Sequence, residues 1–393
     1  MICKHFGTCG GCQLQDVPYL EQLARKTARV EDLLAPFLRD TGTRVRPMVG
    51  APVEPGAMPW GFRHKAAFVF GPGPRARARD MVMGHYARGS KTIVPVTECP
   101  VHAPRANRIA FALRDELARA HVPAAGPVLD GILRHVLVRT TADEQAAVVM
   151  LVVTRNDKAL RLPIRRFLAG PERPDGFLLN VHDRPGPFMV GRETLRLDGH
   201  ASVREDRLGT PFLVSPAAFF QTNPDQAAVL VDEVTRGVFG DQPADGTLVL
   251  DLYAGSGLFA VPLAAAGATV TAVESNRQAT RDAEVNARLN RLPDGRLRMV
   301  PSDVEDALGR MTRARVDAVV LDPPRAGCPP PVVDAVFGGL APPRAVYVSC
   351  NPDALVVDLT RVLPHGYAVT RVQPVDMFPH TDHIETVVWL ERS

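Results

Sequence analysis

From about residue 216 onward, the chain alternates short apolar runs with stretches of helical periodicity. Because strands that alternate with helices form parallel sheets covered on both faces, this rhythm predicts an α/β domain with a doubly wound, mostly parallel sheet. Seven runs are expected to be its strands: "TLVLDL", "ATVTAVE", "LRMVPSD", "VDAVVLD", "RAVYVSC", "YAVTRVQPVD" and "IETVVWLE".

The N-terminal half has a different pattern. Residues 18–38 repeat apolar side chains at helical spacing, which predicts a helix that can pack on the catalytic domain. Residues 44–215 contain short β-like runs broken by Gly and Pro, which indicate an antiparallel, mostly β domain. We therefore expect a region 1–215, with a cysteine-rich start, the helix and a β-rich RNA-binding domain, followed by a catalytic domain 216–393.

Composition sets limits on location and partners. The 393 residues include no run of 18 apolar residues and no secretory leader, so a cytoplasmic protein without a membrane segment is expected. The net charge is +3, but the first hundred residues hold 14 Lys/Arg against 8 Asp/Glu. This basic start favours a polyanionic partner, although only 5 of the 46 basic residues are Lys, which also fits a general Arg bias.

The first run of the α/β region ends in a glycine turn. In "LVLDLYAGSGLFAVPLA", Gly255-Ser256-Gly257 lets the backbone approach a ligand at a helix N-terminus, and the third Gly of a dinucleotide fingerprint is missing. Glu274 ends the next strand, where it can bind ribose hydroxyls, and Asp303 ends the third, near an adenine amino group. Such successive acidic residues are typical of S-adenosylmethionine (SAM) methyltransferases; the alternative is a structural turn as in flavodoxin-like folds.

The carboxyl ends of parallel strands meet at one edge of a sheet, where ligands bind. Asp322 and Cys350 end the fourth and fifth strands. If the last strand runs antiparallel, Glu385 at its start joins them. The sheet therefore places a thiol and two carboxylates near the expected methyl donor.

These residue types suit methylation of carbon 5 of uracil. A Cys350 thiolate added to carbon 6 would activate carbon 5, Glu385 would remove the carbon-5 proton, and Asp322 would accept the N3–H. Pro352 suits a first helical turn, and the helix N-terminus is expected to favour the thiolate. The alternative for Cys350 is an inert buried thiol.

Four segments resemble the RNA (uracil-5-)-methyltransferase family: "DPPRAG" (322–327), "SCNP" (349–352), "DMFPHTDHIET" (376–386) and "FFQTNPDQA" (219–227). The resemblance implies a Rossmann-like class I SAM methyltransferase domain, with a seven-stranded sheet whose last strand is antiparallel. It also implies that Gln221 and Tyr253 contact the cofactor. The first segment is similar to the DPPY of DNA amino-methyltransferases as well, but Arg325 lacks their aromatic face.

Cysteines cluster at the N-terminus. Cys3, Cys9 and Cys12, with the distant Cys99, can hold zinc or an iron–sulfur cluster. The arrangement is similar to the 4Fe–4S site of the 23S rRNA branch of the family, which implies a cluster, with zinc as the alternative, in a structural role within a β-rich central domain. Cys328 is expected to be structural.

The RNA-binding face is expected in the β-rich domain. The family often carries an N-terminal TRAM domain ahead of its cysteines; here they begin at residue 3, so we expect it to be lacking. Arg63 and Lys65, in a segment similar to the family, are expected to contact phosphates. Arg75, Arg77 and Arg79 form either an RNA-contacting loop or a solvated hairpin.

The resulting hypothesis is SAM-dependent methylation of carbon 5 of a uridine in RNA through a Cys–uracil adduct. The resemblance implies 23S rRNA as the substrate, and tRNA is an alternative. Two other functions stay open: a non-catalytic RNA-binding or assembly factor, and an enzyme acting on DNA or a small molecule. No obligate protein partner is implied.

Overall fold

A computed structural model describes residues 2–39, 41–73, 81–186, 189–311 and 314–393, and it divides into two compact units. Unit 1 contains residues 1–16, 59–205 and 213–218, and unit 2 contains residues 17–58, 206–212 and 219–393. The chain therefore does not divide at a single point near residue 215. Arg75, Arg77 and Arg79 lie outside the described residues.

Unit 2 is built on a seven-stranded sheet of the described residues, in the order β12-β11-β10-β13-β14-β16-β15. Strands β10 to β14 are parallel, and β16 runs antiparallel between β14 and β15. This order confirms the doubly wound α/β fold with an antiparallel last strand. The strands are β10 (Leu248–Leu252), β11 (Thr269–Val273), β12 (Leu297–Val300), β13 (Ala318–Leu321), β14 (Arg344–Ser349), β15 (Tyr367–Val375) and β16 (Glu385–Arg392).

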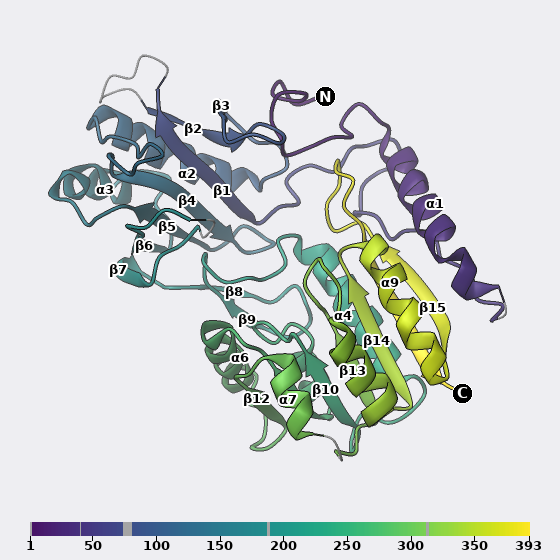
Figure 1. Cartoon of the computed structure of the whole chain (residues 1–393). Helices are drawn as coiled ribbons and strands as arrows, with labels where there is room; N and C mark the ends of the chain where they lie inside the picture. The colour runs from purple at the N-terminus through teal and green to yellow at the C-terminus, as the bar shows by residue number, and fades with distance from the viewer. Residues whose placement is uncertain (1, 40, 74–80, 187–188, 312–313) are drawn as a thin grey trace. The chain divides into compact units, whose positions relative to one another are not determined.

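Helices lie along this sheet (Figure 1). One large apolar core joins the strands to side chains of α1, α7, α8 and α9, while α4, α5 and α6 contact the strands without contributing to that core. The helices are α1 (Tyr19–Leu38), α4 (Pro224–Phe239), α5 (Ala260–Ala265), α6 (Arg277–Leu289), α7 (Val304–Arg310), α8 (Pro330–Val333) and α9 (Pro352–Val362).

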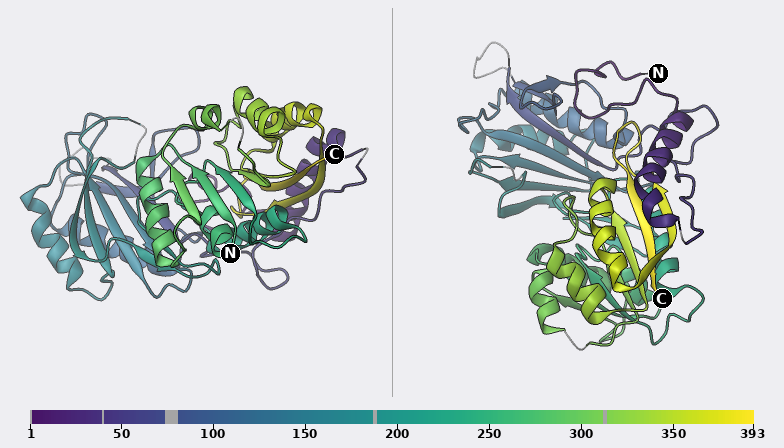
Figure 2. Two further views of the ribbon diagram at one scale, coloured as in Figure 1. Left: turned by 90° about the horizontal axis from the view of Figure 1, so that it is seen from below. Right: turned by 45° about the vertical axis from the view of Figure 1, so that its right-hand side comes forward.

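Helix α1 belongs to unit 2 because its apolar stripe is buried there. Val30 and Leu34 are fully buried in the core that also holds α9 and β15, and the right-hand view of Figure 2 shows α1 beside these elements. After α1, the backbone bridges β15 in parallel through Val45–Val372 and Val49–Val375. The helix and this segment thus extend the end of the sheet that carries β15.

Unit 1 contains a second seven-stranded sheet of described residues, in the order β3-β2-β1-β4-β5-β6-β7. Strands form where the β-like runs predicted them, but β5 and β6 pair in parallel, so the antiparallel expectation is wrong for this pair. The strands are β1 (Lys65–Pro72), β2 (Met81–Tyr86), β3 (Ile93–Pro95), β4 (Leu133–Thr140), β5 (Ala147–Val153), β6 (Gly176–Val181) and β7 (Glu193–Gly199); β8 (Val203–Glu205) and β9 (Phe212–Val214) form a separate pair.

Two helices of unit 1 were not expected, α2 (Pro104–Arg119) and α3 (Arg161–Leu168). Helix α2 buries Ile109, Leu113 and Leu117 against the sheet, at the spacing of one helical face, and its N1 proline marks its start. Helix α3 makes the crossover between β5 and β6, which explains why these strands are parallel. Among the described residues, no helix combines the length and apolar character that a membrane span needs.

Candidate active site and cysteine pocket

The register of β14 against β16 brings the predicted nucleophile and base together. Ser349 pairs with Thr386 in this antiparallel ladder, so the next positions along the two strands are Cys350 and Glu385. Residues opposite each other in antiparallel strands lie within about 5.5 Å at their Cα atoms. The ladder that closes the sheet therefore sets the thiol beside the carboxylate.

Asp322 joins this pair from the neighbouring strand. It follows β13, which lies between β10 and β14, and its backbone N–H donates to the Leu252 oxygen at 3.3 Å. Its negative charge and that of Glu385 both act on the Cys350 thiol. The three predicted catalytic residues thus converge at the carboxyl edge of the sheet.

The electrostatics of this edge differ from the expectation for Cys350. Burial raises the pKa of its thiol to about 11, with the charges of Glu385 and Asp322 adding to the effect and Arg325 opposing it. Helix α9 does begin just after the thiol, with the Asn351 side chain accepting from Asp353 N–H at 3.3 Å. The predicted preference for thiolate is wrong for the free protein, because burial and two carboxylates outweigh one helix N-terminus.

The two carboxyl groups also favour their protonated forms. Burial raises the pKa of Asp322 to about 7. Burial and the Asp322 charge raise the pKa of Glu385 well above its usual value. Such shifts, caused by desolvation and like charge together, are typical of catalytic acids and bases.

The loop that carries Asp322 is tied to helix α9 by Asp358, a buried residue to which no function was assigned. Its Oδ2 accepts the Cys328 backbone N–H at 2.8 Å and the Tyr347 hydroxyl. The Asn351 side chain adds a bond to the Arg325 carbonyl at 3.0 Å. The segments after β13 and β14 are thus fixed to each other by the two buried bonds to Asp358 and by the exposed Asn351–Arg325 bond.

Cys328 connects this network to the glycine turn. Its side chain lies close to those of Tyr347 and Tyr253, and burial raises the pKa of its thiol to about 12. Tyr253 itself has a left-handed backbone, with φ of +63°, which is strained for an aromatic residue. The predicted structural role of Cys328 has a physical basis in these contacts.

The segment that leads to Glu385 is held by helix α1. Lys26 Nζ makes a buried ion pair with Asp376 Oδ1 at 2.6 Å, and Tyr19 donates to the other Asp376 oxygen at 2.8 Å. Gln22 Oε1 accepts the backbone N–H of His380 at 2.9 Å, where the backbone is left-handed. Sequence periodicity predicted the helix but gave no signal for these polar contacts, since they join residues 350 or more positions apart.

The glycine turn after β10 has the geometry of a ligand site. Gly255 and Gly257 have φ of +55° and +87°, and a Cβ at Gly257 would lie 2.8 Å from the Val261 side chain. The Glu274 carboxylate accepts the N–H groups of Gly255 at 2.9 Å and Asn276 at 2.6 Å. Each of its oxygens keeps a further lone pair for a ribose hydroxyl.

Other predicted cofactor residues lie along the same unit. Asp303 is the exposed N-cap of α7 after β12, so it shares the carboxyl edge with Glu274. Gln221 precedes α4 in the same unit. Asp251 is a further candidate residue at this edge that was not among the predicted site residues. It is fully buried on β10, and burial together with the charges of Asp322 and Glu274 raises its pKa well above its usual value.

In unit 1, the four cysteines predicted to bind a metal or cluster line one cavity of about 210 Å³: Cys3, Cys9, Cys12 and Cys99. The N-terminal segment reaches the sheet through a bridge between Cys9 and Ala87, and Gly10 donates to the Tyr86 oxygen at 3.0 Å. A Cβ at Gly10 would lie 2.9 Å from that oxygen, so only glycine permits this approach. Burial raises the pKa of Cys99 to about 12, and the nearby Cys12 and Cys9 charges add to this.

The expectation that Arg63 and Lys65 are free for phosphates is wrong for the described structure. Arg63 lines the cysteine cavity, where burial lowers its pKa and the charges of Cys99 and Cys12 raise it. Lys65 donates to the Ala218 carbonyl at 3.0 Å, and its burial near Arg139 lowers its pKa to about 7. Both side chains therefore have partners within unit 1.

Comparisons with known proteins agree with this geometry. The family model described as tRNA (Uracil-5-)-methyltransferase matches residues 214–393. An uncharacterized RNA methyltransferase of Gloeobacter violaceus is 34% identical, over 100% of this chain and 82% of that protein. One of Caldanaerobacter subterraneus is 30% identical, over 100% of this chain and 84% of that protein.

A solved structure is similar over nearly the whole chain. It is the tRNA (uracil-54, C5)-methyltransferase of Pyrococcus abyssi in complex with S-adenosyl-L-homocysteine, with a TM-score of 0.77 and 25% identity, over 98% of this chain and 86% of that one. The sheet order and the carboxyl-edge residues define a SAM-dependent RNA methyltransferase. The chain belongs to the RNA (uracil-5-)-methyltransferase family.

Proposed function

We propose that this enzyme methylates carbon 5 of a specific uridine through a covalent bond between Cys350 and the uracil ring. The observation that carries the proposal is the β14–β16 ladder: Cys350 and Glu385 each lie one position beyond its last pair, Ser349 and Thr386, and Asp322 directly follows the adjacent strand β13. An inert buried thiol has no need of two carboxyl groups whose pKa values are raised.

The reaction assigns one task to each side chain. The Cys350 thiol gives its proton to solvent and, as the thiolate, bonds to carbon 6, while ionised Asp322 accepts the N3–H and orients the ring. Carbon 5, now electron-rich, takes the methyl group that SAM supplies, leaving S-adenosylhomocysteine. Glu385 then removes the carbon-5 proton, the bond between sulfur and carbon 6 breaks, and the thiolate is restored as 5-methyluridine leaves.

The raised pKa values suit this sequence. The free enzyme keeps Cys350 as a thiol, which protects it from side reactions. A carboxylate whose pKa is raised is a stronger base once it is ionised, so Glu385 suits removal of a carbon-bound proton. The target base must be unpaired or flipped out, since its carbon 6 is inaccessible within a stack.

Residues at the carboxyl edge and before α4 are assigned to the cofactor. The Gly255 turn would pass close to the amino-acid part, Glu274 would bind the ribose hydroxyls, and Asp303 would accept from the adenine amino group. Tyr253, at the same turn, and Gln221 complete the set. Their side chains supply binding and orientation.

The cysteine cavity fits a 4Fe–4S cluster held by Cys3, Cys9, Cys12 and Cys99. Burial raises the pKa of the Cys12 thiol and the nearby Cys9 and Cys3 charges add to this, so bound iron would compensate the charge of thiolates crowded in this cavity. The cluster would tie the N-terminal segment to the β sheet of unit 1. A Cys9→Ala protein purified without oxygen should lose the cluster absorbance; unchanged absorbance would remove Cys9 from the ligand set.

Ribosomal RNA of the large subunit (23S rRNA) is our first proposed substrate, because the four-cysteine cavity matches the resemblance to that branch of the family. Transfer RNA is the second candidate, since the similar Pyrococcus abyssi structure is a tRNA (uracil-54, C5)-methyltransferase. Methyl-labelled SAM incubated with rRNA and tRNA transcripts separates the two. Mapping 5-methyluridine in total RNA with and without the gene identifies the position.

The adduct is tested with RNA that contains 5-fluorouridine, whose fluorine cannot be removed as a proton. We expect this RNA and SAM to form an enzyme–RNA complex that survives denaturation, and Cys350→Ala to form none. Cys350→Ser should reduce methyl transfer below about 10⁻³ of the parent rate, because a hydroxyl is far less ionised than a thiol. Turnover at the parent rate by Cys350→Ser would exclude the adduct.

A further inference from the structure

A second cavity of unit 1 lies on the face of the sheet that is turned away from α2. Its volume is about 670 Å³, within the range of about 300–1,000 Å³ that is usual for ligand sites. Val69 pairs with His135 of β4 on one side and with Gly84 of β2 on the other, so these residues share the cavity face. The preceding residue, Phe68, points to the other face and packs on Phe111 of α2.

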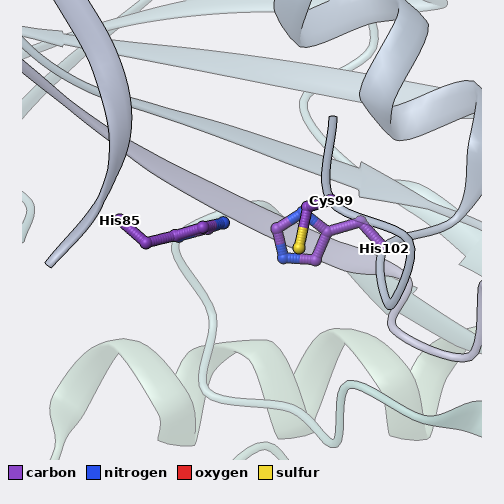
Figure 3. Close-up of side chains that lie close together, drawn as sticks. All are labelled: His85, Cys99 and His102. Atoms are coloured by element: carbon purple, nitrogen blue, oxygen red, sulfur yellow. The ribbon is translucent and has the colours of Figure 1, made fainter. Parts of the chain in front are cut away.

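This cavity is separate from the one that the cysteines line. Figure 3 shows His85 with Cys99 and His102 in the cysteine cavity. The next residue, Tyr86, pairs with Ile93 of β3, and both line the second cavity. Among the described lining residues, the two cavities share only Tyr86, because successive residues of a strand point to opposite faces.

The lining of the second cavity combines apolar side chains with two cations, and its described residues include no Asp or Glu. Arg134 Nη1 donates to the carbonyls of His182 at 2.6 Å and Arg184 at 2.8 Å, which fixes the guanidinium while its other N–H groups have no partner in the described part of the chain. Lys91 is exposed and makes no ion pair with any described carboxylate. The apolar side chains include Val69, Val82, Ile93 and Leu129.

His135 is a half-buried polar group of this cavity. Its Nδ1 is buried and has no hydrogen-bond partner among the described residues. Burial lowers the pKa of its imidazole to about 4, and the charges of Arg134 and His182 add to this, so the ring is neutral and offers one donor and one acceptor. Because nearly all buried polar groups are paired, this imidazole indicates a ligand with a polar edge.

One wall of the cavity is a strained loop. Leu129 has a left-handed backbone with φ of +60°, which is unfavourable for a bulky residue. Hydrogen bonds hold it there: Leu129 N–H donates to the Gly126 oxygen at 3.0 Å, and Gly126 N–H donates to Asp130 Oδ1 at 3.0 Å. Ala125 N–H also donates to the Leu133 oxygen at 2.8 Å, which ties the loop to β4. Backbone strain of this kind is concentrated at binding sites.

We infer that this cavity binds one unstacked nucleobase of the RNA substrate, outside the target uridine, with the adjoining phosphate at Lys91 and Arg134. The inference rests on the proposed RNA substrate but not on the methyl-transfer step. A nucleobase has flat apolar faces for the cavity floor and for the ring of Tyr86, which is 46% exposed, and a polar edge for His135. Cations without a lining carboxylate favour a polyanion, and only an unpaired base can leave its stack to enter.

The base is tested by fluorescence anisotropy with labelled hexamers of uridine and of adenosine, and with an abasic ribose-phosphate hexamer of equal charge. We expect the full-length protein to bind at least one base-containing hexamer at least about 10-fold more tightly than the abasic one. Ala125→Trp, which fills the cavity from its wall, should reduce this ratio at least about fivefold. Val128→Trp, in the same loop but 82% exposed and outside the lining, is the matched control and should keep the ratio.

The phosphate is tested by Lys91→Ala, an exposed substitution that leaves the cavity walls unchanged. It should weaken binding of all three hexamers about threefold and reduce the salt dependence of binding, because one counterion-releasing contact is lost. Arg88→Ala is the matched control, since Arg88 is an exposed cation of the same β2–β3 turn and does not line the cavity.

Photocrosslinking with a hexamer that contains 4-thiouridine gives the location. Crosslinks are expected in peptides that contain Tyr86 or residues 125–135, and Ala125→Trp should lose them. Crosslinks confined to unit 2, an unchanged ratio in Ala125→Trp, or equal affinity of the parent for base-containing and abasic hexamers would each overturn the inference. Because no measurement here needs methyl transfer, a parent with these properties that methylates no RNA would reject the proposed reaction and leave this site standing.

Discussion

Two regions of the molecule gather thiols, and their surroundings differ in charge. At the carboxyl edge of unit 2, Cys350 lies beside Glu385 and Asp322; burial raises the pKa of its thiol, and these two carboxyl groups, which can also exchange protons with a substrate, raise it further. In unit 1, burial raises the pKa values of Cys12 and Cys99, and the charges of neighbouring thiols add to this. The side chains beside Cys99 are the imidazoles of His85 and His102. The first arrangement suits a nucleophile, and the second suits a cation.

Apart from replacement of Cys350 itself, the largest effect is expected for Glu385→Gln, which removes the proposed base and keeps its size. Turnover should fall by about 10³-fold, within the range that general bases contribute, because the carbon-5 proton can no longer leave. The covalent enzyme–RNA complex should accumulate with ordinary uridine RNA and SAM, since its breakdown is blocked. Labelled methyl transfer and a denaturing gel measure the two quantities.

Glu391→Gln, an exposed position on the same strand, is the matched control and should leave turnover unchanged. Glu385→Gln also removes a negative charge next to Cys350, so the thiol of this variant should react faster with iodoacetamide near pH 9 than the thiol of the parent. Full turnover by Glu385→Gln, without accumulated complex, would show that another group takes the proton.

A smaller loss is expected for Asp322→Asn, about 100-fold in kcat/KM, since an amide accepts the N3–H less strongly than a carboxylate. The parent rate should rise with pH through about 7 as Asp322 ionises, and this step should be missing from the variant. A pH–rate profile of both proteins tests this. The same step in Asp322→Asn would assign the ionisation to another residue.

The same substitution should stabilise the fold. Asp322 binds its proton more tightly in the folded protein, with a pKa of about 7, than in the unfolded chain, so stability is lost as pH rises from about 4 to 7. Above pH 7, Asp322→Asn should therefore raise the free energy of unfolding by about 1–3 kcal/mol. Asp294→Asn, an exposed position, is the control, and thermal unfolding at pH 5 and pH 8 is the measurement.

The sequence predicted the α/β region well because strand alternation is a local signal. Each strand of unit 2 formed where an apolar run predicted it, and the strand-end residues Glu274, Asp322 and Cys350 reached one edge because parallel sheets impose that. The antiparallel direction of the last strand also followed from the class of fold. Position along the chain was therefore sufficient to find the candidate site.

What the sequence missed depends on long-range contacts. Helix α2 has a clear apolar stripe, but the Gly- and Pro-rich context suggested only strands. Asp358 and Lys26 lie on predicted helices, and only the folded chain shows that their side chains are buried against distant loops. The ionisation of Cys350 was mispredicted for the same reason, because burial is a tertiary property.

The next prediction concerns how the nucleophile and its loop are positioned. Asp358→Asn keeps the volume but weakens acceptance from Cys328 N–H and the Tyr347 hydroxyl, which should lower kcat about 10-fold, equal to about 1.4 kcal/mol. The rate of adduct formation with 5-fluorouridine RNA should fall equally, and the KM for RNA should not change. Asp353→Asn, exposed on the same helix, should be neutral, and a changed RNA KM with unchanged kcat would contradict a positioning role.

The smallest effect is expected at Cys328, a third thiol whose surroundings are neither catalytic nor metal-binding. Cys328→Ser keeps the backbone N–H that donates to Asp358, and the serine hydroxyl can form hydrogen bonds with Tyr253 and Tyr347. Cys328→Ser should therefore keep turnover within about threefold and stability within about 1 kcal/mol of the parent. Cys350→Ser, which changes the same atom in the other environment, should lose activity by at least about 10³-fold. Comparable losses in the two variants would mean that the surroundings of a thiol do not decide its function here.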